Sequence, residues 1–240
     1  MINIRQSDIA KELNISRVSV SKALRDHPDI SPAMKKKILE VANRLGYVPN
    51  LIARQLNSRR TFTLGIVVPD LENSFFSYIT DSMIDYATEH NYFVILTVSR
   101  EKEIHEKRNI DNLIGLRVDG LLVCLSQETT DREVFSKVKK MNIPLVFFDR
   151  AFDNLKFSRV VFNDKLGAEN SLNRIIQEGY TKIAKFAGYS NTNIGKDRLE
   201  GFKEALLKNK IPVRTDWIIE GGFEVKDGYE SFKKLNKLGN

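Results

Sequence analysis

Residues 8–24 read DIAKELNISRVSVSKAL, and this pattern predicts two short helices joined by a tight turn. Apolar residues from Ile9 to Leu13 share one face of the first helix. Ser16 can cap the second helix, because its hydroxyl can accept a backbone N–H two or three residues further on. Two helices so closely joined are typical of a helix-turn-helix, which places its second helix in the major groove of DNA.

The second helix, which should end near residue 24, has an apolar face and a polar face. Val20, Ala23 and Leu24 are expected to be buried. The residues expected to point outward are Arg17, Val18, Ser21 and Lys22. The polar face is therefore the one that can meet a partner.

A third helix is predicted between Ser31, which caps it, and Gly46, which ends it. Pro32 stands at the first helical position, where its missing N–H costs nothing. The apolar stripe that would cover the first two helices consists of Met34, Ile38, Val41 and Leu45.

The charge of the chain is unevenly distributed. Residues 1–60 contain 12 Lys and Arg and 5 Asp and Glu, whereas residues 61–240 contain 26 of each. The whole net charge of +7 therefore lies in the first quarter of the chain. A basic segment that folds into helices favours nucleic acid as its partner over a membrane surface.

The segment after the third helix supports two interpretations. Pro49 breaks the helix, and Asn50 can cap a new one of about two turns, over residues 51–58. A helix this short is marginal in water, so it needs a partner to fold against. The alternative is a plain linker between domains.

From residue 61 onward, short apolar strands alternate with amphipathic helices. The runs TLGIVV, YFVILTV, GLLVCL and PLVFFD predict four strands, and a second series is predicted to begin at Val160, Val161 and Phe162. Such a pattern predicts a doubly wound α/β fold with a parallel sheet.

Ligands of such sheets bind beyond the carboxyl ends of the strands. The residues at these positions are Asn73, Ser74, Phe75 and Phe76 after the first strand, Ser126 after the third, and Asp149 and Arg150 after the fourth. Four of them also have a purely structural interpretation. Phe75 and Phe76 start a helix and one of them is expected in the core, Asp149 could be no more than a cap at the end of its strand, and Arg150 could form a surface or lobe–lobe ion pair.

Several classes of protein are disfavoured. The single cysteine, Cys124, excludes a disulfide framework, and the sequence contains no phosphate-binding glycine motif and no nucleophile elbow. The three histidines, His27, His90 and His105, form no metal-ligand pattern. We therefore expect no enzyme, no catalytic residue, no metal and no cofactor. With no secretory signal and no run of about 20 apolar residues, we expect a cytoplasmic protein without a membrane partner.

Residues 8–24, together with residues 30–70, resemble the start of a bacterial transcription regulator of the LacI/GalR family. The second stretch reads ISPAMKKKILEVANRLGYVPNLIARQLNSRRTFTLGIVVPD. The helix-turn-helix, third helix, hinge helix and first sensor strand of that family match it in order and spacing. The resemblance continues through residues 73–96, 117–123, 143–150 and 198–206, and it covers essentially the whole chain.

The resemblance implies that the chain binds a near-palindromic operator as a homodimer, most simply as a repressor. The residues expected to contact DNA are Ser16, Arg17, Val18, Ser21 and Lys22 in the second helix, and Asn50, Ala53, Arg54 and Leu56 in the hinge. Lys22 stands where the family most often has arginine, and lysine lacks the planar bidentate fork. Leu56 matches the leucine that the family wedges into the minor groove.

The resemblance also implies a two-lobed α/β sensor, similar to periplasmic binding proteins, behind a helical headpiece. The expected parts are a DNA-binding domain at 1–48, a hinge at 49–60, a first lobe at 61–160 and a second lobe at 161–240. A sugar-like effector would bind between the lobes, at Asn73, Phe75, Phe76, Ser126, Asp149 and Arg198. The family has further strands and a return crossover, so the second lobe is expected to be incomplete.

Two alternatives follow from the same resemblance. One is a truncated DNA binder that does not respond to an effector. The other is a solute-binding protein of the same sensor fold, which would need a secretion signal and would have no use for a basic headpiece.

Overall fold

The computed structural model describes residues 4–48, 60–152, 154–222 and 225–238. These residues form two compact units, which divide between Thr61 and Phe62. Each unit has its own hydrophobic core, and each is treated separately below.

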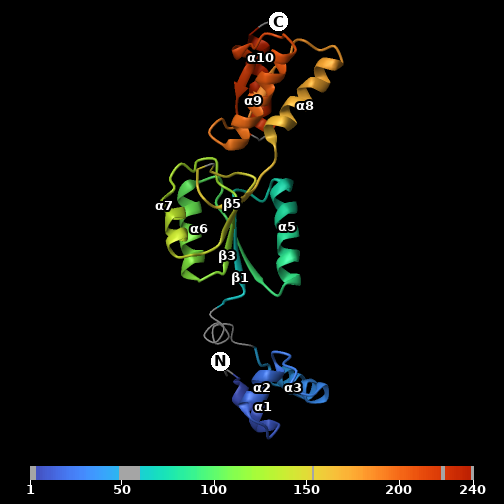
Figure 1. Cartoon of the computed structure of the whole chain (residues 1–240), viewed down its shortest axis with the longest axis vertical. Helices are drawn as coiled ribbons and strands as arrows, with labels where there is room; N and C mark the ends of the chain where they lie inside the picture. The colour runs from blue at the N-terminus through green and yellow to red at the C-terminus, as the bar shows by residue number, and fades with distance from the viewer. Residues whose placement is uncertain (1–3, 49–59, 153, 223–224, 239–240) are drawn as a thin grey trace. The chain divides into compact units, whose positions relative to one another are not determined.

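Over residues 4–48, the first unit is helical and surrounds a small core. In the described residues of this unit, the helices are α1 (Gln6–Glu12), α2 (Arg17–Ala23) and α3 (Pro32–Leu45) (Figure 1). Their caps are the predicted ones, since the hydroxyl of Ser16 accepts the Ser19 N–H at 3.0 Å and that of Ser31 accepts the Met34 N–H at 3.4 Å. Gly46 ends α3 with a φ of +70°, a left-handed conformation that suits glycine.

The core of this unit follows the predicted apolar faces. Ile9, Val20 and Ile38 have no exposed surface, and Met34 and Leu45 pack against the same cluster. The stripe of α3 therefore covers α1 and α2, as the sequence predicts. The hinge helix predicted over 51–58, with Asn50, Ala53, Arg54 and Leu56, lies outside the described residues.

The second unit begins with a parallel sheet of five strands in the order β2-β1-β3-β4-β5. The strands are β1 (Thr63–Val68), β2 (Phe93–Val98), β3 (Gly120–Val123), β4 (Leu145–Phe148) and β5 (Ser158–Val160). The helices between them are α5 (Ser74–Glu89), α6 (Glu103–Gly115) and α7 (Glu133–Lys140). We call this sheet with its helices the first lobe. The four predicted strands and the three helices between them are confirmed.

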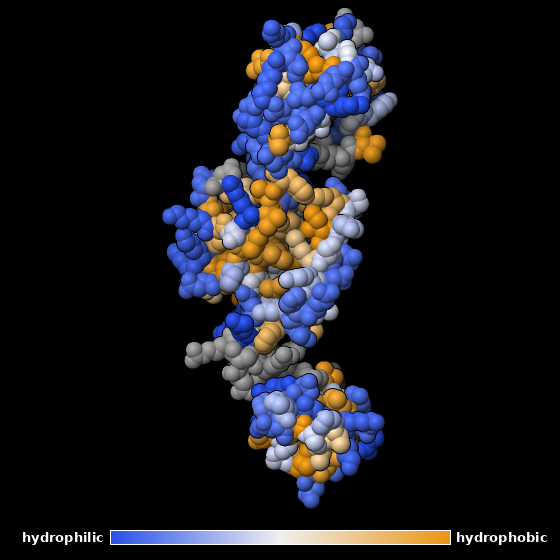
Figure 2. All heavy atoms as spheres, turned by 45° about the vertical axis from the view of Figure 1, so that its right-hand side comes forward, coloured by the Kyte–Doolittle hydropathy of each residue, from blue (hydrophilic) through white to orange (hydrophobic). Residues whose placement is uncertain are grey.

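Helices cover the two faces of this sheet unequally. Residues of α6 and α7, including Leu113 and Phe135, pack into one core cluster with β1, β3 and β4. Residues of α5, including Phe76, pack with the other face. Figure 1 shows α5 on one side of the sheet and α6 and α7 on the other, and Figure 2 shows hydrophobic residues gathered over the sheet beside α5.

The sequence prediction is wrong about the strand that was expected to start at Val160. β5 ends at Val160, and it pairs parallel to β4 with Phe148 opposite Val160. Val161 and Phe162 follow the strand and are exposed. The reason is that β4 offers an open edge to the preceding residues, Ser158 and Arg159, which carry no apolar pattern of their own.

The second lobe contains a two-stranded parallel sheet in the described residues. Its elements are α8 (Asp164–Gln177), β6 (Lys185–Ala187), α9 (Asn193–Lys208), a 3-10 turn (Thr215–Trp217), β7 (Ile218–Glu220) and α10 (Val225–Lys237). Helices α8 and α9 lie very close together at Gly201, where a Cβ atom would stand 2.1 Å from the backbone oxygen of Lys165. Leu172 and Phe202 form the core between them.

Candidate nucleic-acid interface and ligand cleft

The outward face of α2 carries the residues that the sequence predicts to read DNA. Arg17 and Val18 are exposed, and the exposed fraction of Val18 reaches 63%. Ser21 and Lys22 are half-buried. An exposed cation beside an exposed apolar side chain can donate to guanine and contact a thymine methyl group.

Ser16 has a different part in this surface. Its hydroxyl accepts the Ser19 N–H and lies 2.9 Å from the Ser19 hydroxyl. The oxygen is therefore engaged in capping α2, and its main contribution is to fix the start of the helix.

Lys22 is held by an acidic partner that the sequence analysis missed. Its Nζ lies 2.5 Å from Oδ2 of Asp29, in the turn between α2 and α3. The hydrogen bond from Lys22 lowers the pKa of the Asp29 carboxyl, with a further contribution from His27. The second pair of this turn joins Lys35 to Asp26 at 2.6 Å. The contact with Asp29 uses one of the three N–H donors of Lys22 and holds its ammonium beside this turn.

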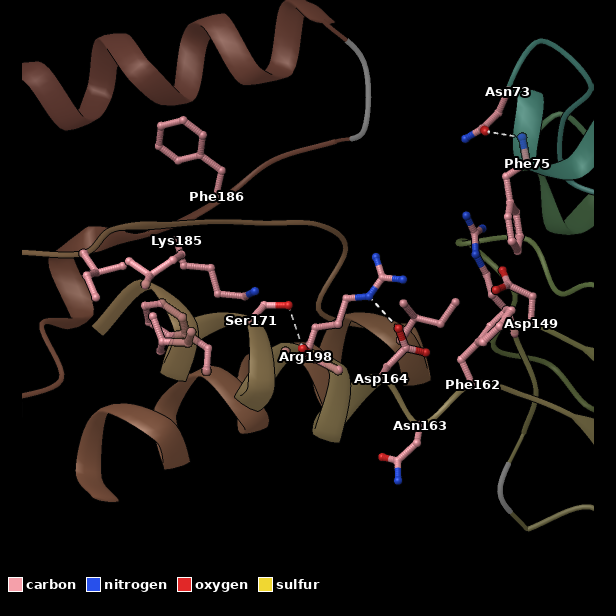
Figure 3. A pocket seen from close by; sticks show the side chains of 18 of the residues that line it. Asn73, Phe75, Asp149, Phe162, Asn163, Asp164, Ser171, Lys185, Phe186 and Arg198 are labelled. Atoms are coloured by element: carbon pink, nitrogen blue, oxygen red, sulfur yellow. Dashed lines mark hydrogen bonds and ion pairs between the residues drawn. The ribbon is translucent and has the colours of Figure 1, made fainter. Parts of the chain in front are cut away.

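A cleft of about 920 Å³ opens in the second unit, with residues of both lobes in its walls (Figure 3). The residues from the first lobe are Asn73, Phe75, Phe76, Asp149 and Arg150. Those from the second lobe include Asp164, Ser171, Lys185, Phe186 and Arg198. The structure thus brings together five of the six residues predicted for an effector, and Ser126 is the exception.

Ser126 lies at the carboxyl end of β3 but is 3% exposed and does not line the cleft. Its N–H and hydroxyl donate to Oε2 of Glu106, at 2.6 and 3.0 Å. Its hydroxyl also lies 2.6 Å from that of Ser99. Through these contacts the polar groups of Ser126 hold the loop after β3. Its partner, Glu106, is buried in α6, and no local sequence pattern predicts that a glutamate lies there.

Asp149 stands in the wall of the cleft at the end of β4. It is 7% exposed, and its backbone adopts a φ of +60°. Burial raises the pKa of Asp149 above its usual value, and Arg150 opposes that rise. The Asp149 N–H donates to the Val160 oxygen at 2.9 Å, and its carbonyl accepts from the Asn193 amide at 3.4 Å. A carboxylate fixed in this way can accept hydrogen bonds from ligand hydroxyls.

Arg150 forms a buried ion pair within the first lobe, so it belongs neither to the surface nor to a bridge between lobes. One of its terminal nitrogens lies 2.8 and 2.9 Å from the carboxylate oxygens of Glu101. Its guanidinium also packs over Phe76, 5.6 Å from the ring centroid. Phe76 is therefore the phenylalanine that lies in the core. Phe75 is half-buried, and its ring centroid lies 6.3 Å from that of Phe162.

Arg198 projects from α9 and is anchored by Asp164 at the start of α8. Its Nε lies 2.6 Å from Oδ1 of Asp164, which is 8% exposed. Figure 3 shows the two terminal nitrogens of Arg198 directed away from Asp164. The ion pair fixes the guanidinium while leaving its outer edge to a ligand. Asn73 is similar, because its Oδ1 caps α5 by accepting the Phe75 N–H at 3.0 Å, and Figure 3 shows its amide nitrogen directed away from Phe75.

Within the described ranges, no group of three or more histidine, cysteine, aspartate or glutamate side chains is arranged to hold a metal ion. Among the same residues, no helix has both the length and the apolar composition needed to cross a membrane.

Two family models match this chain. Residues 7–50 match the bacterial regulatory proteins of the lacI family. Residues 61–239 match the periplasmic binding proteins and sugar binding domain of the LacI family. The chain belongs to the LacI family. It is a DNA-binding transcription regulator with a sensor domain for a small molecule.

Individual relatives place this LacI-family chain among regulators of similar architecture. It is 31% identical over 235 residues to catabolite control protein A of Priestia megaterium, covering 98% of this chain and 70% of the relative. It is 30% identical to a probable repressor, ExuR, of Bacillus subtilis, covering 100% of this chain and 71% of the relative.

A solved structure shares the fold of this LacI-family chain. It is the lac repressor dimer bound to operator and the anti-inducer ONPF, with a TM-score of 0.83 and 22% identity. The match covers 98% of this chain and 71% of that structure.

Proposed function

We propose that this chain is a repressor that binds a near-palindromic operator as a homodimer, and that a sugar-like effector between its lobes modulates the binding. The observation that carries the proposal is the face of α2, where Arg17 and Val18 are exposed while Val20 is buried. The excess positive charge in residues 1–60 adds a sequence-independent attraction to the phosphates. The lac repressor that shares this fold is a dimer on its operator.

The proposed division of labour follows the chain. Residues 1–48 bind DNA, residues 49–60 form the hinge, and residues 61–160 and 161–240 are the two lobes of the sensor. Binding of a small molecule is supported by Arg198 and Asn73, which line the cleft and are held in place by an ion pair with Asp164 and by the cap of α5. A regulator of DNA acts where the chromosome lies, so we place it in the bacterial cytoplasm.

The test begins with a duplex selected from a randomised pool by the full chain. We expect the selected duplex to bind far more tightly than a scrambled one, and its affinity to fall steeply as salt increases, because neutralised phosphates release counterions. Arg17→Ala should weaken binding by roughly 5- to 150-fold, as expected for about 1–3 kcal/mol, and relax selectivity at one base position.

Lys37→Ala is the matched control. Lys37 is exposed on α3, so its removal takes one positive charge from the same unit without altering α2. It should weaken binding to both duplexes equally. Equal affinity of the wild-type chain for selected and scrambled duplexes would contradict the proposal.

A further inference from the structure

Lys185 is an unusual residue for the wall of this cleft. It lies in β6, within the apolar run IAKFA, and its side chain packs over Phe202 with Nζ 5.4 Å from the ring centroid. It is half-buried. In the part of the chain that the structure describes, no carboxylate forms an ion pair with it. A partly buried ammonium without a counter-charge is unfavourable, so it is a candidate to bind an anion.

Arg198 brings a second cation to the same part of the cleft. Both residues line it, and Figure 3 shows the ammonium of Lys185 pointing along the cleft toward Ser171 and Arg198. The pKa of Lys185 is lowered, first by burial and then by the charge of Arg198. Two like charges that destabilise one another would both be stabilised by an anion between them.

The part of the cleft around Asp149 has the reverse character. Asp149 is a buried carboxyl group whose pKa is raised first by burial and also by the charge of Asp164, and its carboxylate would repel an anion. It can accept hydrogen bonds from hydroxyl groups instead. Phe75 and Phe162, whose ring centroids lie 6.3 Å apart, add an apolar surface on which a sugar ring can pack.

We infer that the effector is an acidic sugar, whose hydroxyls face Asp149 and whose anionic group binds between Lys185 and Arg198. The anionic group is a carboxylate or a phosphate, which share the ability to accept from both cations. Asp164 accepts a hydrogen bond from Nε of Arg198 and so orients this side chain. The terminal nitrogens of the guanidinium can then donate to the anion. This inference rests on the proposed function of the cleft as the effector site.

The first experiment titrates the full chain with matched ligands in a calorimeter. The probes are glucose, galactose and fructose, the uronates of the two aldoses, the 6-phosphates of all three, and inorganic phosphate. We expect at least one acidic member to bind ten-fold or more tightly than its neutral parent, with an affinity that falls as salt increases. The uronate and phosphate arms distinguish the two sources of the anion.

The second experiment compares Lys185→Met with Lys182→Met. Methionine can replace Lys185 in the strand and keep the contact with Phe202, so only the charge is lost. Lys182 is exposed just before β6 and does not line the cleft, which makes its variant a control with the same net charge. We expect Lys185→Met to weaken binding of the acidic sugar at least ten-fold, while Lys182→Met binds like the wild type.

Three results would overturn the inference: neutral parents that bind as tightly as the acidic sugars, equal behaviour of the two methionine variants, or no binding of any acidic member. If neutral sugars bind and acidic ones do not, the cleft is still supported as the effector site, and only the proposed preference for acidic sugars is contradicted. Operator binding is measured without sugar, so a failure of DNA recognition would appear in that assay alone.

Discussion

Glu106 is a carboxyl group of α6 that has no exposed surface. Its two oxygens accept from the N–H and hydroxyl of Ser126 and from the hydroxyl of Thr129, the last at 2.9 Å. Burial raises the pKa of Glu106 from its usual 4.5 to about 7, although these hydrogen bonds lower it. The folded chain therefore keeps the Glu106 proton at pH values where an ordinary glutamate side chain has released it.

We predict that the first lobe loses stability as pH rises from about 4.5 to 7. In that window the unfolded chain has released the Glu106 proton and the folded chain still holds it, so the folded state binds more protons. The expected loss is at most roughly 3 kcal/mol, at about 1.4 kcal/mol for each pH unit between the two values. Glu106→Gln, which resembles the protonated acid, should flatten this slope and be the more stable protein at pH 8. Urea unfolding of the wild type and of Glu106→Gln between pH 5 and 8 measures the slope with pH and the free energy of unfolding at pH 8.

Glu103 provides a control of opposite sign one helical turn away. The backbone N–H of Thr130, which donates to it at 2.7 Å, lowers the pKa of Glu103. Its stabilisation is present above the unfolded pKa and is lost as pH falls through the folded one. Glu103→Gln should therefore lose stability at pH 7. A wild-type pH slope retained in Glu106→Gln would contradict the prediction.

We predict that Asp29 restrains DNA recognition by Lys22. Asp29→Asn removes the carboxylate that holds Lys22 and also removes one negative charge that repels phosphate. Operator affinity at low salt should rise on the order of ten-fold, with a changed preference at the base that Lys22 contacts.

Asp26→Asn removes the same charge from the same turn, but its partner is Lys35 on α3. It should raise affinity without changing base preference, so identical base preferences in the two variants would show that Asp29 acts by charge alone.

At the scale of elements, the contact between α8 and α9 depends on Gly201. We predict that Gly201→Ala destabilises the second lobe by about 1–3 kcal/mol, because the new methyl group would overlap the backbone oxygen of Lys165. The single tryptophan of the chain, Trp217, lies in this lobe, so its fluorescence during urea unfolding reports the change.

Gly228→Ala is the comparison for that variant. Gly228 lies in α10, and among the described residues no atom beyond the backbone of its own helix and its chain neighbours stands within 4 Å of the position its Cβ would take. Alanine should therefore be neutral or add up to about 1 kcal/mol through its better helix propensity. If both variants unfold alike, close packing of α8 on α9 is not what requires glycine.

At the scale of the molecule, the two units should unfold independently. Ile38 is fully buried in the core of the first unit and Phe135 in that of the first lobe. Ile38→Ala should cost about 2–5 kcal/mol and Phe135→Ala about 3–5 kcal/mol, each within its own unit. Amide hydrogen exchange should rise in α1–α3 for the first variant and in the five-stranded sheet for the second. Faster exchange in both units from a single substitution would show that they fold together.

The sequence by itself determined the elements whose signals are local. The caps at Ser16 and Ser31, the stop at Gly46 and the apolar spacing of α3 all act over three or four residues, and the structure reproduces them. The runs that form β1 to β4 are apolar enough to be recognised without their neighbours. The candidate residues Asn73 and Asp149 were found by a general rule, since ligands bind at the carboxyl ends of parallel strands.

Only the tertiary structure decided the contacts between distant residues. Glu106 meets Ser126 across 20 positions, and Asp164 meets Arg198 across 34. The strand β5 has little pattern of its own and exists because β4 leaves an edge to pair with. In the sequence, Lys185 only interrupts the apolar run of a predicted strand. The fold places it with Arg198 in the wall of the same cleft. Periodicity and capping energies depend on near neighbours, whereas the partner of a buried charge depends on the path of the whole chain.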